Sequence, residues 1–289
     1  MFEYIESKSI LSKIRQTDTL FGINYSMNLY RGCQHGCVYC DTRSDCYQVG
    51  DISNIRVKKN AIDLLKKELT AKHIKGTIGT GSMNDPYMPL EAKLEITRQA
   101  LQVIAQKHFP VHIITKGKLV TRDIDILKEI HKTYCAVSLT ITTADDNLAK
   151  KIEPYASKSS ERFATIETLA LQGIYCGVTL MPLLPGINDN WQNIENIIRK
   201  AVDSGASYII PMLGVTLRKG SRDYLFKAFD KDFPGMKQTY EKQFGENYMC
   251  YGPDYKVLYQ KCSDLCAKLD ISTKMNFYEG EKDQQLSLF

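Results

Sequence analysis

The feature that most constrains the fold of this chain is a regular alternation of short apolar runs with amphipathic stretches. Strands are expected near 25–30, 76–80, 111–115, 136–141, 174–181 and 208–213. Between them, apolar residues recur with helical spacing near 61–69, 90–107, 124–132, 160–172 and 191–204. Six strands that alternate with helices predict an α/β fold with a parallel sheet and right-handed crossovers.

A cysteine motif follows the first expected strand. Cys33, Cys37 and Cys40 have the spacing C-x3-C-x2-C, with no fourth cysteine close by. Three thiolates in one loop suit a [4Fe-4S] cluster in which one iron stays open for another ligand. Gly32 and Gly36 let the backbone turn closely around the sulfur atoms. The spacing therefore favours an iron-sulfur centre at which chemistry can occur.

Two other uses of these cysteines need weighing. A structural zinc site would need His35 as its fourth ligand, but structural zinc ligands usually come from two separated pairs. Disulfides are disfavoured, because the chain has nine cysteines, an odd number, and no apolar signal stretch at its start. Inert thiols are the remaining alternative. No apolar run is long enough to span a membrane, so we expect a cytoplasmic protein.

The cysteine loop, with Tyr39 directly before the third cysteine, resembles that of the radical S-adenosylmethionine (SAM) superfamily. More narrowly, the chain resembles the spore-photoproduct-lyase-like branch, often labelled DNA repair photolyase. The resemblance covers most of 24–217 and rests on these motifs in order: Tyr30-Arg31-Gly32-Cys33 through Cys40, Asn84-Asp85-Pro86-Tyr87, Pro89-Leu90-Glu91, Thr115-Lys116-Gly117, Ser138-Leu139-Thr140, Glu153-Pro154 with Arg162, and Pro185-Gly186-Ile187-Asn188-Asp189.

This resemblance implies a domain organisation and a position for the site. It implies a partial (β/α)6 barrel of the TIM type over 24–217, after an N-terminal extension over 1–23. A small helical extension over 218–278 and a flexible tail over 279–289 would follow. In such barrels the reactive centre lies at the carboxyl ends of the strands, where most of these motifs fall.

The resemblance also implies the cofactors and the residues that hold them. Cys33, Cys37 and Cys40 would bind a [4Fe-4S] cluster, and SAM would bind its open iron. Expected SAM contacts are Lys116 and Ser138 at the carboxylate, Ser82 and Asn84 near the amino end, and Tyr39 behind the adenine, with Arg162 holding the loop or forming a surface salt bridge. One electron from a carrier such as flavodoxin or ferredoxin would yield a 5′-deoxyadenosyl radical that takes a hydrogen atom from the substrate.

Burial gives independent support for two of these residues. Lys116 and Ser138 are polar residues at the end or in the interior of otherwise apolar strands. A buried polar group without a partner costs about 1–3 kcal/mol, so a bound ligand is a natural partner for each.

The sequence departs from spore photoproduct lyase at two positions that bear on its chemistry. The lyase resemblance calls for a hydrogen-donating cysteine in the loop after the second strand, yet 78–86 contains none. It also calls for a tyrosine after the third cluster cysteine, where this chain has Asp41. Cys46, Tyr47 and Tyr87 are weak candidates to replace these groups, with simple packing as the alternative. The lyase reaction is therefore not expected to transfer unchanged.

Three later cysteines raise the question of a second cluster. Cys262 and Cys266 would share one helical face, and Cys250 precedes them. An apolar stripe that includes Leu258 and Leu265 runs along the same face, which favours cysteine as a small core residue.

The last five residues form a second informative motif. Gln285-Leu286-Ser287-Leu288-Phe289 resembles the peptide by which bacterial DNA polymerases and repair proteins bind the β sliding clamp. Leu286, Leu288 and Phe289 would fill an apolar cleft, and Gln285 would hydrogen-bond at its rim. The alternative is a tail that folds back on its own barrel.

Together these features predict a radical SAM enzyme that acts on DNA lesions or modified bases and binds the clamp. The formal charge of +5 is modest and does not decide the substrate. One alternative moves the radical chemistry to RNA or a small metabolite. The other is a non-catalytic iron-sulfur module that binds DNA or senses redox state.

Overall fold

The computed structural model describes residues 2–16 and 18–280. Its centre is a parallel sheet made of the strands that the sequence alternation predicted. These strands are β3 (Tyr25–Met27), β6 (Ile78–Thr80), β7 (Val111–Thr115), β8 (Cys135–Thr140), β9 (Tyr175–Leu180) and β10 (Tyr208–Pro211). They lie in chain order across the sheet, each parallel to the next, so the predicted partial α/β barrel is confirmed.

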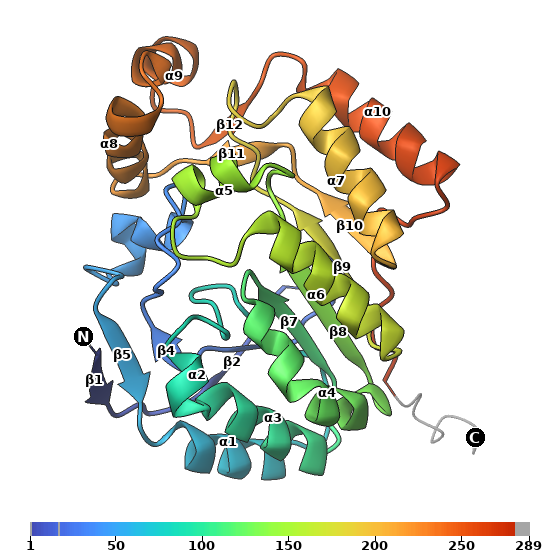
Figure 1. The fold of residues 1–289 in the computed structure, drawn as a ribbon. Coiled ribbons are helices and arrows are strands. Elements are labelled where there is room, and N and C mark those ends of the chain that lie inside the picture. Colours follow the sequence, from blue (N-terminus) through green and yellow to red (C-terminus); the bar gives the residue numbers. More distant parts are fainter. Residues whose placement is uncertain (1, 17, 281–289) are drawn as a thin grey trace, which may run out of the picture.

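Helices cover the outer face of this sheet, as Figure 1 shows for α3, α4, α6 and α7. The main helices are α1 (Ala61–Thr70), α3 (Ile96–Gln106), α4 (Ile124–His131), α6 (Ser159–Leu171) and α7 (Trp191–Asp203). Their apolar faces pack on strands that are almost wholly buried, as crossover helices require. Within the described part of the chain, no helix is both long and apolar enough to cross a membrane.

The strand expected over 25–30 is two strands in different sheets. The backbone leaves the main sheet after Met27, and β4 (Tyr30–Arg31) pairs instead with β5 (Ile55–Lys58), which also pairs with β1 (Phe2–Ile5). At the edge of the main sheet, β2 (Leu11–Lys13) runs antiparallel to β3. The segment before β5 holds the start of the cysteine loop, because the Cys33 amide donates to the Ile52 carbonyl at 2.8 Å.

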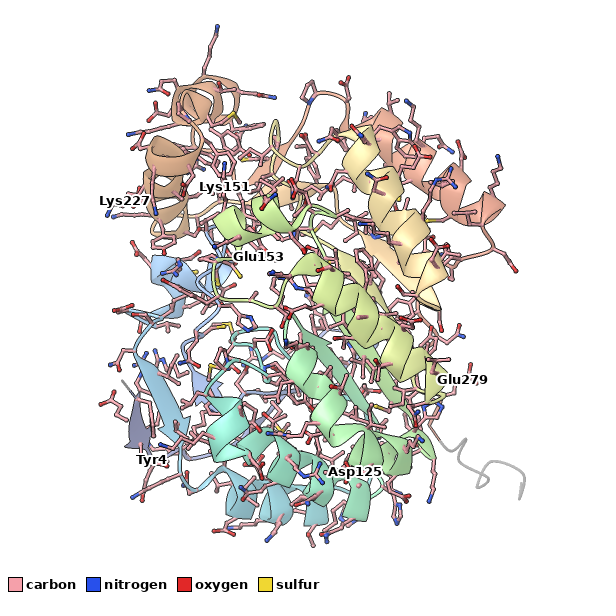
Figure 2. All side chains as sticks on the ribbon, viewed as in Figure 1. Tyr4, Asp125, Lys151, Glu153, Lys227 and Glu279 are labelled. Carbon is pink, nitrogen blue, oxygen red and sulfur yellow. The ribbon has the colours of Figure 1, made fainter. Side chains whose placement is uncertain are left out.

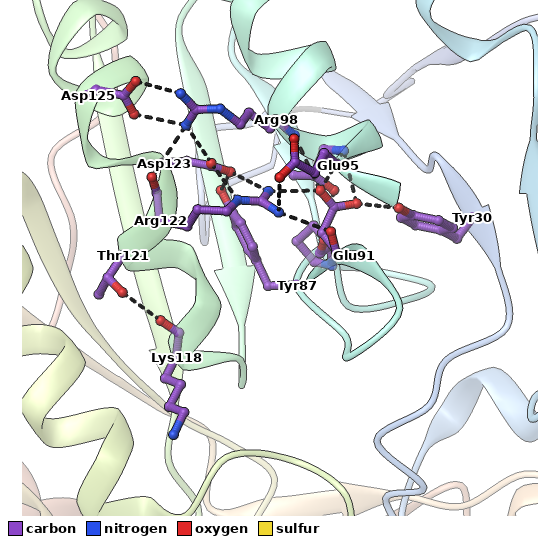
Figure 3. A network of polar contacts seen from close by, with 12 residues as sticks. Tyr30, Tyr87, Glu91, Glu95, Arg98, Lys118, Thr121, Arg122, Asp123 and Asp125 are labelled. Atoms are coloured by element: carbon purple, nitrogen blue, oxygen red, sulfur yellow. Dashed lines mark hydrogen bonds and ion pairs between the residues drawn. The ribbon is translucent and has the colours of Figure 1, made fainter. Parts of the chain in front are cut away.

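The helix expected over 90–107 is also divided. A short helix α2 (Glu91–Leu94) ends at Glu95, whose φ of 53° is left-handed, and α3 then begins. The buried Glu91 carboxylate accepts hydrogen bonds from the Thr97 amide at 3.1 Å and so caps the first turn of α3. The same carboxylate binds Arg122, as Figure 3 shows. Tertiary contacts of one buried acid therefore break the helical run.

Short elements occupy the loops that face the cysteine region. They are the 3-10 turns η1 (Asp41–Arg43), η2 (Asp45–Tyr47) and η3 (Lys118–Asp123), and the helix α5 (Asp146–Ile152). The C-terminal part contains β11 (Gly214–Thr216), which pairs antiparallel with β12 (Met249–Tyr251), and the helices α8 (Ser221–Asp232), α9 (Met236–Phe244) and α10 (Tyr255–Lys268).

The C-terminal helices do not form a separate unit. Leu258 and Cys262 of α10 belong to the main apolar core, and α10 packs on α7. Phe229 of α8 and Tyr240 of α9 pack together in a second apolar cluster, which also contains Tyr39 of the cysteine loop. The C-terminal extension therefore helps to hold the loop in place.

Candidate active site: a cysteine-lined cavity at the carboxyl ends of the strands

A cavity of about 340 Å³ lies at the carboxyl ends of the parallel strands. Its walls come from the cysteine loop and from the segments that follow each strand. The lining residues are Phe21, Cys33, His35, Cys37, Tyr39, Cys40, Asp41, Thr42, Gly81, Ser82, Met83, Asn84, Asp85, Ile114, Thr115, Lys116, Thr140, Thr179, Met181, Pro182, Met212, Val215 and Thr216. This is the end of a barrel at which active sites are built.

Cys33, Cys37 and Cys40 all line this one cavity. The two glycines of the loop make the approach possible: Gly32 and Gly36 have φ values of 93° and 68°. A Cβ on Gly32 would lie 2.7 Å from the Ile52 carbonyl oxygen, so no larger residue fits there. The backbone thus brings three thiols to the wall of the same cavity.

The chemistry of these thiols fits an iron-sulfur cluster. Burial raises the pKa of Cys33 to about 12 and also raises that of Cys37, so both need a cation to become thiolates. The Cys3His zinc alternative would need His35 as its fourth ligand, but His35 Nδ1 lies 3.3 Å from the Asp85 carboxylate. Cys33, Cys37 and Cys40 are the residues that would hold an iron-sulfur cluster.

Asp85 fixes the loop after β6 against the end of β7. Its buried carboxylate accepts hydrogen bonds from Thr115 Oγ1 at 2.6 Å and from the Lys116 amide at 2.7 Å, and it lies 3.3 Å from His35 Nδ1. Burial opposes the charge, but His35, Thr115 and the Lys116 amide outweigh it and hold the pKa of Asp85 well below its usual range. His35 is thus paired with an acid and positions the cysteine loop.

Lys116 brings a positive charge into the cavity. Burial favours its neutral form, yet negative charge on Cys37 and Glu153 outweighs burial and raises the pKa above its ordinary value. Its ammonium lies 5.7 Å from the centre of the Tyr39 ring. A lysine in this state can bind the carboxylate of a ligand that lies against the cysteines.

Tyr39 also lines the cavity, but Arg162 does not. The Tyr39 hydroxyl donates to Glu153, and Glu153 forms a fully buried ion pair with Arg162, Nη2 to Oε2 2.5 Å. Arg162 Nη1 donates to the Thr140 carbonyl at 2.8 Å. The arginine therefore supports Tyr39 from behind the cavity wall, and neither a direct cofactor contact nor a surface salt bridge describes it.

Ser82 and Asn84 lie in the cavity wall after β6. The Ser82 hydroxyl is 3.3 Å from that of Ser26. Asn84 Nδ2 donates to the Tyr30 carbonyl at 2.8 Å, which ties this loop to β4. Both side chains keep an oxygen that can accept a hydrogen bond from a ligand.

Ser138, an expected SAM contact, is not among the residues that line the cavity. It lies inside β8 and is fully buried, with its hydroxyl 2.8 Å from both His112 Nε2 and the Tyr208 hydroxyl. These partners satisfy the polar group, so the argument for a ligand no longer applies to it. Thr140 lies two residues further along the same face of β8 and lines the cavity in its place.

Tyr87 also lies away from the cavity. Its buried hydroxyl donates to Asp123 at 3.1 Å, within a polar network that includes Glu91 and Arg122. Figure 3 shows this network between the segment around α2 and η3. Tyr87 therefore has a structural role as a buried hydrogen-bond donor.

Cys46 and Tyr47 lie on η2, outside the cavity wall. Arg218 donates to the Tyr47 hydroxyl at 2.8 Å and lies 3.4 Å from Cys46 Sγ. Tyr47 in turn donates to Asp41 at 3.1 Å, and Asp41 lines the cavity. The two residues thus connect to the site through Asp41 and do not enter it.

The three later cysteines are separated in the fold. Cys250 lies in the apolar cluster around Phe229, whereas Cys262 and Cys266 of α10 lie in the main core. No metal-binding group of three forms among them in the described part of the chain. Their positions agree with core packing.

Sequence reasoning missed the apolar part of the cavity lining. Phe21, Met83, Met181 and Met212 contribute apolar or thioether side chains to it. The three methionines follow the ends of β6, β9 and β10, which is the signal that points to such positions, but a methionine in a βα loop does not otherwise differ from a core residue.

The comparisons with known proteins agree with this geometry. Residues 27–209 match the family described as the radical SAM superfamily. An uncharacterized protein of Methanocaldococcus jannaschii is 33% identical over 215 residues, which cover 73% of this chain and 79% of that protein. An uncharacterized protein of Mycobacterium tuberculosis is 25% identical over 92% of this chain and 80% of its own length.

The solved structures that are similar include a mutant of spore photoproduct lyase. It has a TM-score of 0.70 and 14% identity over 95% of this chain and 82% of that chain, which shows a shared fold. The same lyase has been solved with AdoMet and a dinucleoside spore photoproduct bound. A radical SAM Nalpha-GlyT isomerase of Pseudomonas phage M6 is 24% identical over 75% of this chain and 47% of that protein.

The chain belongs to the radical SAM superfamily and is an enzyme of that class. Members of the family use a [4Fe-4S] cluster and SAM, and together these supply a 5′-deoxyadenosyl radical for hydrogen abstraction. The non-catalytic alternative is therefore not favoured.

Proposed function

We propose that this enzyme acts on DNA, at a lesion or a modified nucleobase. The observation that carries the proposal is the mixed lining of the cavity. The cysteines and Lys116 line it together with the apolar or thioether side chains of Phe21, Met181 and Met212. Aromatic and thioether side chains make favourable contacts with flat rings, so these residues suit a nucleobase that has left the stack.

The fold comparison supports the same substrate class. A structure of spore photoproduct lyase that contains dinucleoside spore photoproduct has a TM-score of 0.69 to this chain, at 14% identity. The reaction itself differs in our proposal, because Asp41 follows the third cysteine and no cysteine lies in 78–86. The cavity wall after β6 presents Ser82, Met83 and Asn84 instead of a thiol.

SAM binding is proposed to use the polar residues of the cavity. Lys116 would pair with the methionine carboxylate, Ser82 and Asn84 would contact the amino end, and Tyr39 would back the adenine. Arg162 would act indirectly, because it holds Glu153 and thereby the Tyr39 hydroxyl. The apolar residues of the lining would keep water away from the reacting carbon atoms.

A substrate-dependent product assay tests this function. Cluster-loaded protein is reduced with dithionite in the presence of SAM and of damaged duplex DNA, undamaged duplex DNA or RNA. We expect 5′-deoxyadenosine to form faster with damaged DNA, together with a changed nucleobase detected by mass spectrometry. The triple variant Cys33, Cys37, Cys40→Ala is the control and should give neither product. Faster formation with RNA, or no response to any nucleic acid, would contradict the proposal and favour an RNA or metabolite substrate.

We propose separately that the last five residues bind the bacterial β sliding clamp. Gln285, Leu286, Leu288 and Phe289 lie outside the described residues, so this proposal rests on the sequence motif alone. A pull-down of purified clamp should succeed with the full chain and fail with Leu288→Ala combined with Phe289→Ala. Equal capture of the clamp by both proteins would contradict the proposal that these residues bind it.

A further inference from the structure

A second hollow lies on the outer side of the cysteine loop. It is a groove of about 630 Å³ between the loop, α5 and α8. Gly36 and Val38 of the loop form part of its wall. The groove and the cysteine-lined cavity have no lining residue in common, so the loop separates two compartments.

The groove is basic on balance, because four lysines and one acidic residue, Asp232, line it. Lys150 and Lys151 of α5 and Lys227 and Lys231 of α8 line it, and all four side chains are exposed. None of the four forms an ion pair with another residue in the described ranges. Figure 2 shows Lys151 and Lys227 on the same side of the molecule, above the region of Glu153. Their positive charge is therefore available to a partner.

The groove also comes close to the cluster ligands. Gly36 and Val38 are the chain neighbours of Cys37, and consecutive Cα atoms are about 3.8 Å apart. The ring of Tyr155, whose side chain is 69% exposed, packs on Gly36, because a Cβ on that glycine would lie 2.9 Å from the ring. The Tyr155 amide donates to the His35 carbonyl at 3.1 Å. A molecule in the groove would thus lie one residue away from a cysteine that faces the cavity.

We propose that this groove is the docking surface for a small acidic protein that carries single electrons. The carrier would give up one electron and the cluster would take it up, passing from the 2+ to the 1+ state, with no bond formed or broken. Complementary charge speeds such encounters, and redox partners usually form small, transient interfaces. This inference rests on the radical SAM chemistry and not on the choice of DNA as substrate.

Duplex DNA is the other large anion that a basic groove attracts. The arrangement favours the electron carrier, because a nucleobase must reach the cavity to react and the groove lies on the other side of the loop. An electron has no such requirement and can cross the loop.

A charge-reversal experiment tests the proposal with a purified bacterial flavodoxin as the probe. The groove variant carries Lys150→Glu, Lys151→Glu, Lys227→Glu and Lys231→Glu. Reduction of the cluster by flavodoxin is followed by the loss of its visible absorbance, and carbodiimide cross-links are mapped by mass spectrometry. We expect reduction at least about 10-fold slower than in the wild type, and wild-type cross-links on α5 and α8.

The matched control variant carries four Lys→Glu changes far from the groove. Lys66 and Lys67 of α1, Lys75, and Lys93 of α2 are also exposed, and Figure 1 shows α1 and α2 at the opposite end of the molecule from α8. The control variant should be reduced by flavodoxin at nearly the wild-type rate. Dithionite should reduce both variants like the wild type, which shows that the cluster and the fold are intact.

Three outcomes would overturn the proposal. The first is wild-type reduction of the groove variant by flavodoxin, and the second is cross-linking away from α5 and α8. The third is normal reduction by flavodoxin with lost affinity for a duplex oligonucleotide, which would make the groove a nucleic-acid surface. If the fourfold variant does not fold, the double changes on α5 and on α8 are measured separately. DNA-stimulated 5′-deoxyadenosine formation by the wild type with dithionite needs no electron carrier, so it tests the proposed function separately.

Discussion

Arg162 and Glu153 form an ion pair that is wholly buried behind the cysteine loop, with Nη2 2.5 Å from Oε2. Burial raises the pKa of Glu153, but Arg162 and Lys116 outweigh it, so the carboxyl stays charged and its pKa lies below the ordinary value. Through Glu153 the pair also holds the hydroxyl of Tyr39. This ion pair therefore links α6, which carries Arg162, to Tyr39 in the wall of the cavity.

Replacing Arg162 by Met should strongly destabilise the protein. It would leave the Glu153 carboxylate buried without its partner, a change that costs about 3–5 kcal/mol. The surface pair of Arg199 with Glu195, 2.7 Å apart, provides the control. Arg199→Met should cost less than about 1 kcal/mol in the same urea denaturation series. Similar losses for the two variants would show that the buried pair has no special role.

Lys116→Ala should weaken SAM binding without unfolding the protein. A hydrogen bond to a charged group contributes about 1.5–3 kcal/mol, so the dissociation constant of SAM should rise about 10-fold to 150-fold. Lys118→Ala is a suitable control variant, because Lys118 is exposed and pairs with Glu161 at 2.6 Å. Equilibrium dialysis of SAM against cluster-loaded protein measures both variants. A normal dissociation constant for Lys116→Ala would remove this lysine from the SAM site.

The iron content should depend on one set of cysteines only. Any single Cys→Ala change at 33, 37 or 40 should abolish stable cluster binding, because the cluster would keep two protein ligands. The pair Cys262→Ala and Cys266→Ala should leave about four iron atoms per chain. Iron and sulfide analysis after anaerobic reconstitution tests both expectations. More iron in the wild type than in the α10 double variant would instead reveal a second cluster.

His112 should make the stability of the protein depend on pH. Burial lowers the pKa of His112 to about 3, whereas the unfolded residue titrates near its ordinary value of 6.5. Between these values the unfolded state binds a proton that the folded state does not, so stability falls as the pH drops below about 6.5. The contribution has a limiting slope of about 1.4 kcal/mol per pH unit.

His112→Gln removes this titration, and its unfolding free energy should fall less between about pH 7 and pH 5 than that of the wild type. Denaturation curves at matched pH values give the comparison. Parallel pH profiles for the two proteins would show that His112 does not stay neutral in the folded state.

The parallel strands and their helices could be predicted from the sequence, because each run has a clear period and the right length. The division of the helix near Glu95 could not be predicted. It depends on Glu91, whose carboxylate binds Arg122 from a distant segment and caps the next helix. Likewise, Tyr30 pairs with Val57 in another sheet, and only the folded chain brings them together.

The candidate site could also be predicted only in part from the sequence. The spacing of the three cysteines and the position of Lys116 at a strand end were enough to place them in one cavity. The partners of Ser138 could not be predicted, because polarity within a strand does not show whether the partner is a ligand or a buried neighbour such as His112. Thr140 could have been found by following the same face of the strand to its end.

The separation of the groove from the cavity has a consequence for the order of events in turnover. Two molecules that occupy opposite sides of one loop do not compete, so neither has to leave before the other arrives. The enzyme can form a ternary complex in either sequence, and raising the concentration of one partner should not inhibit binding of the other.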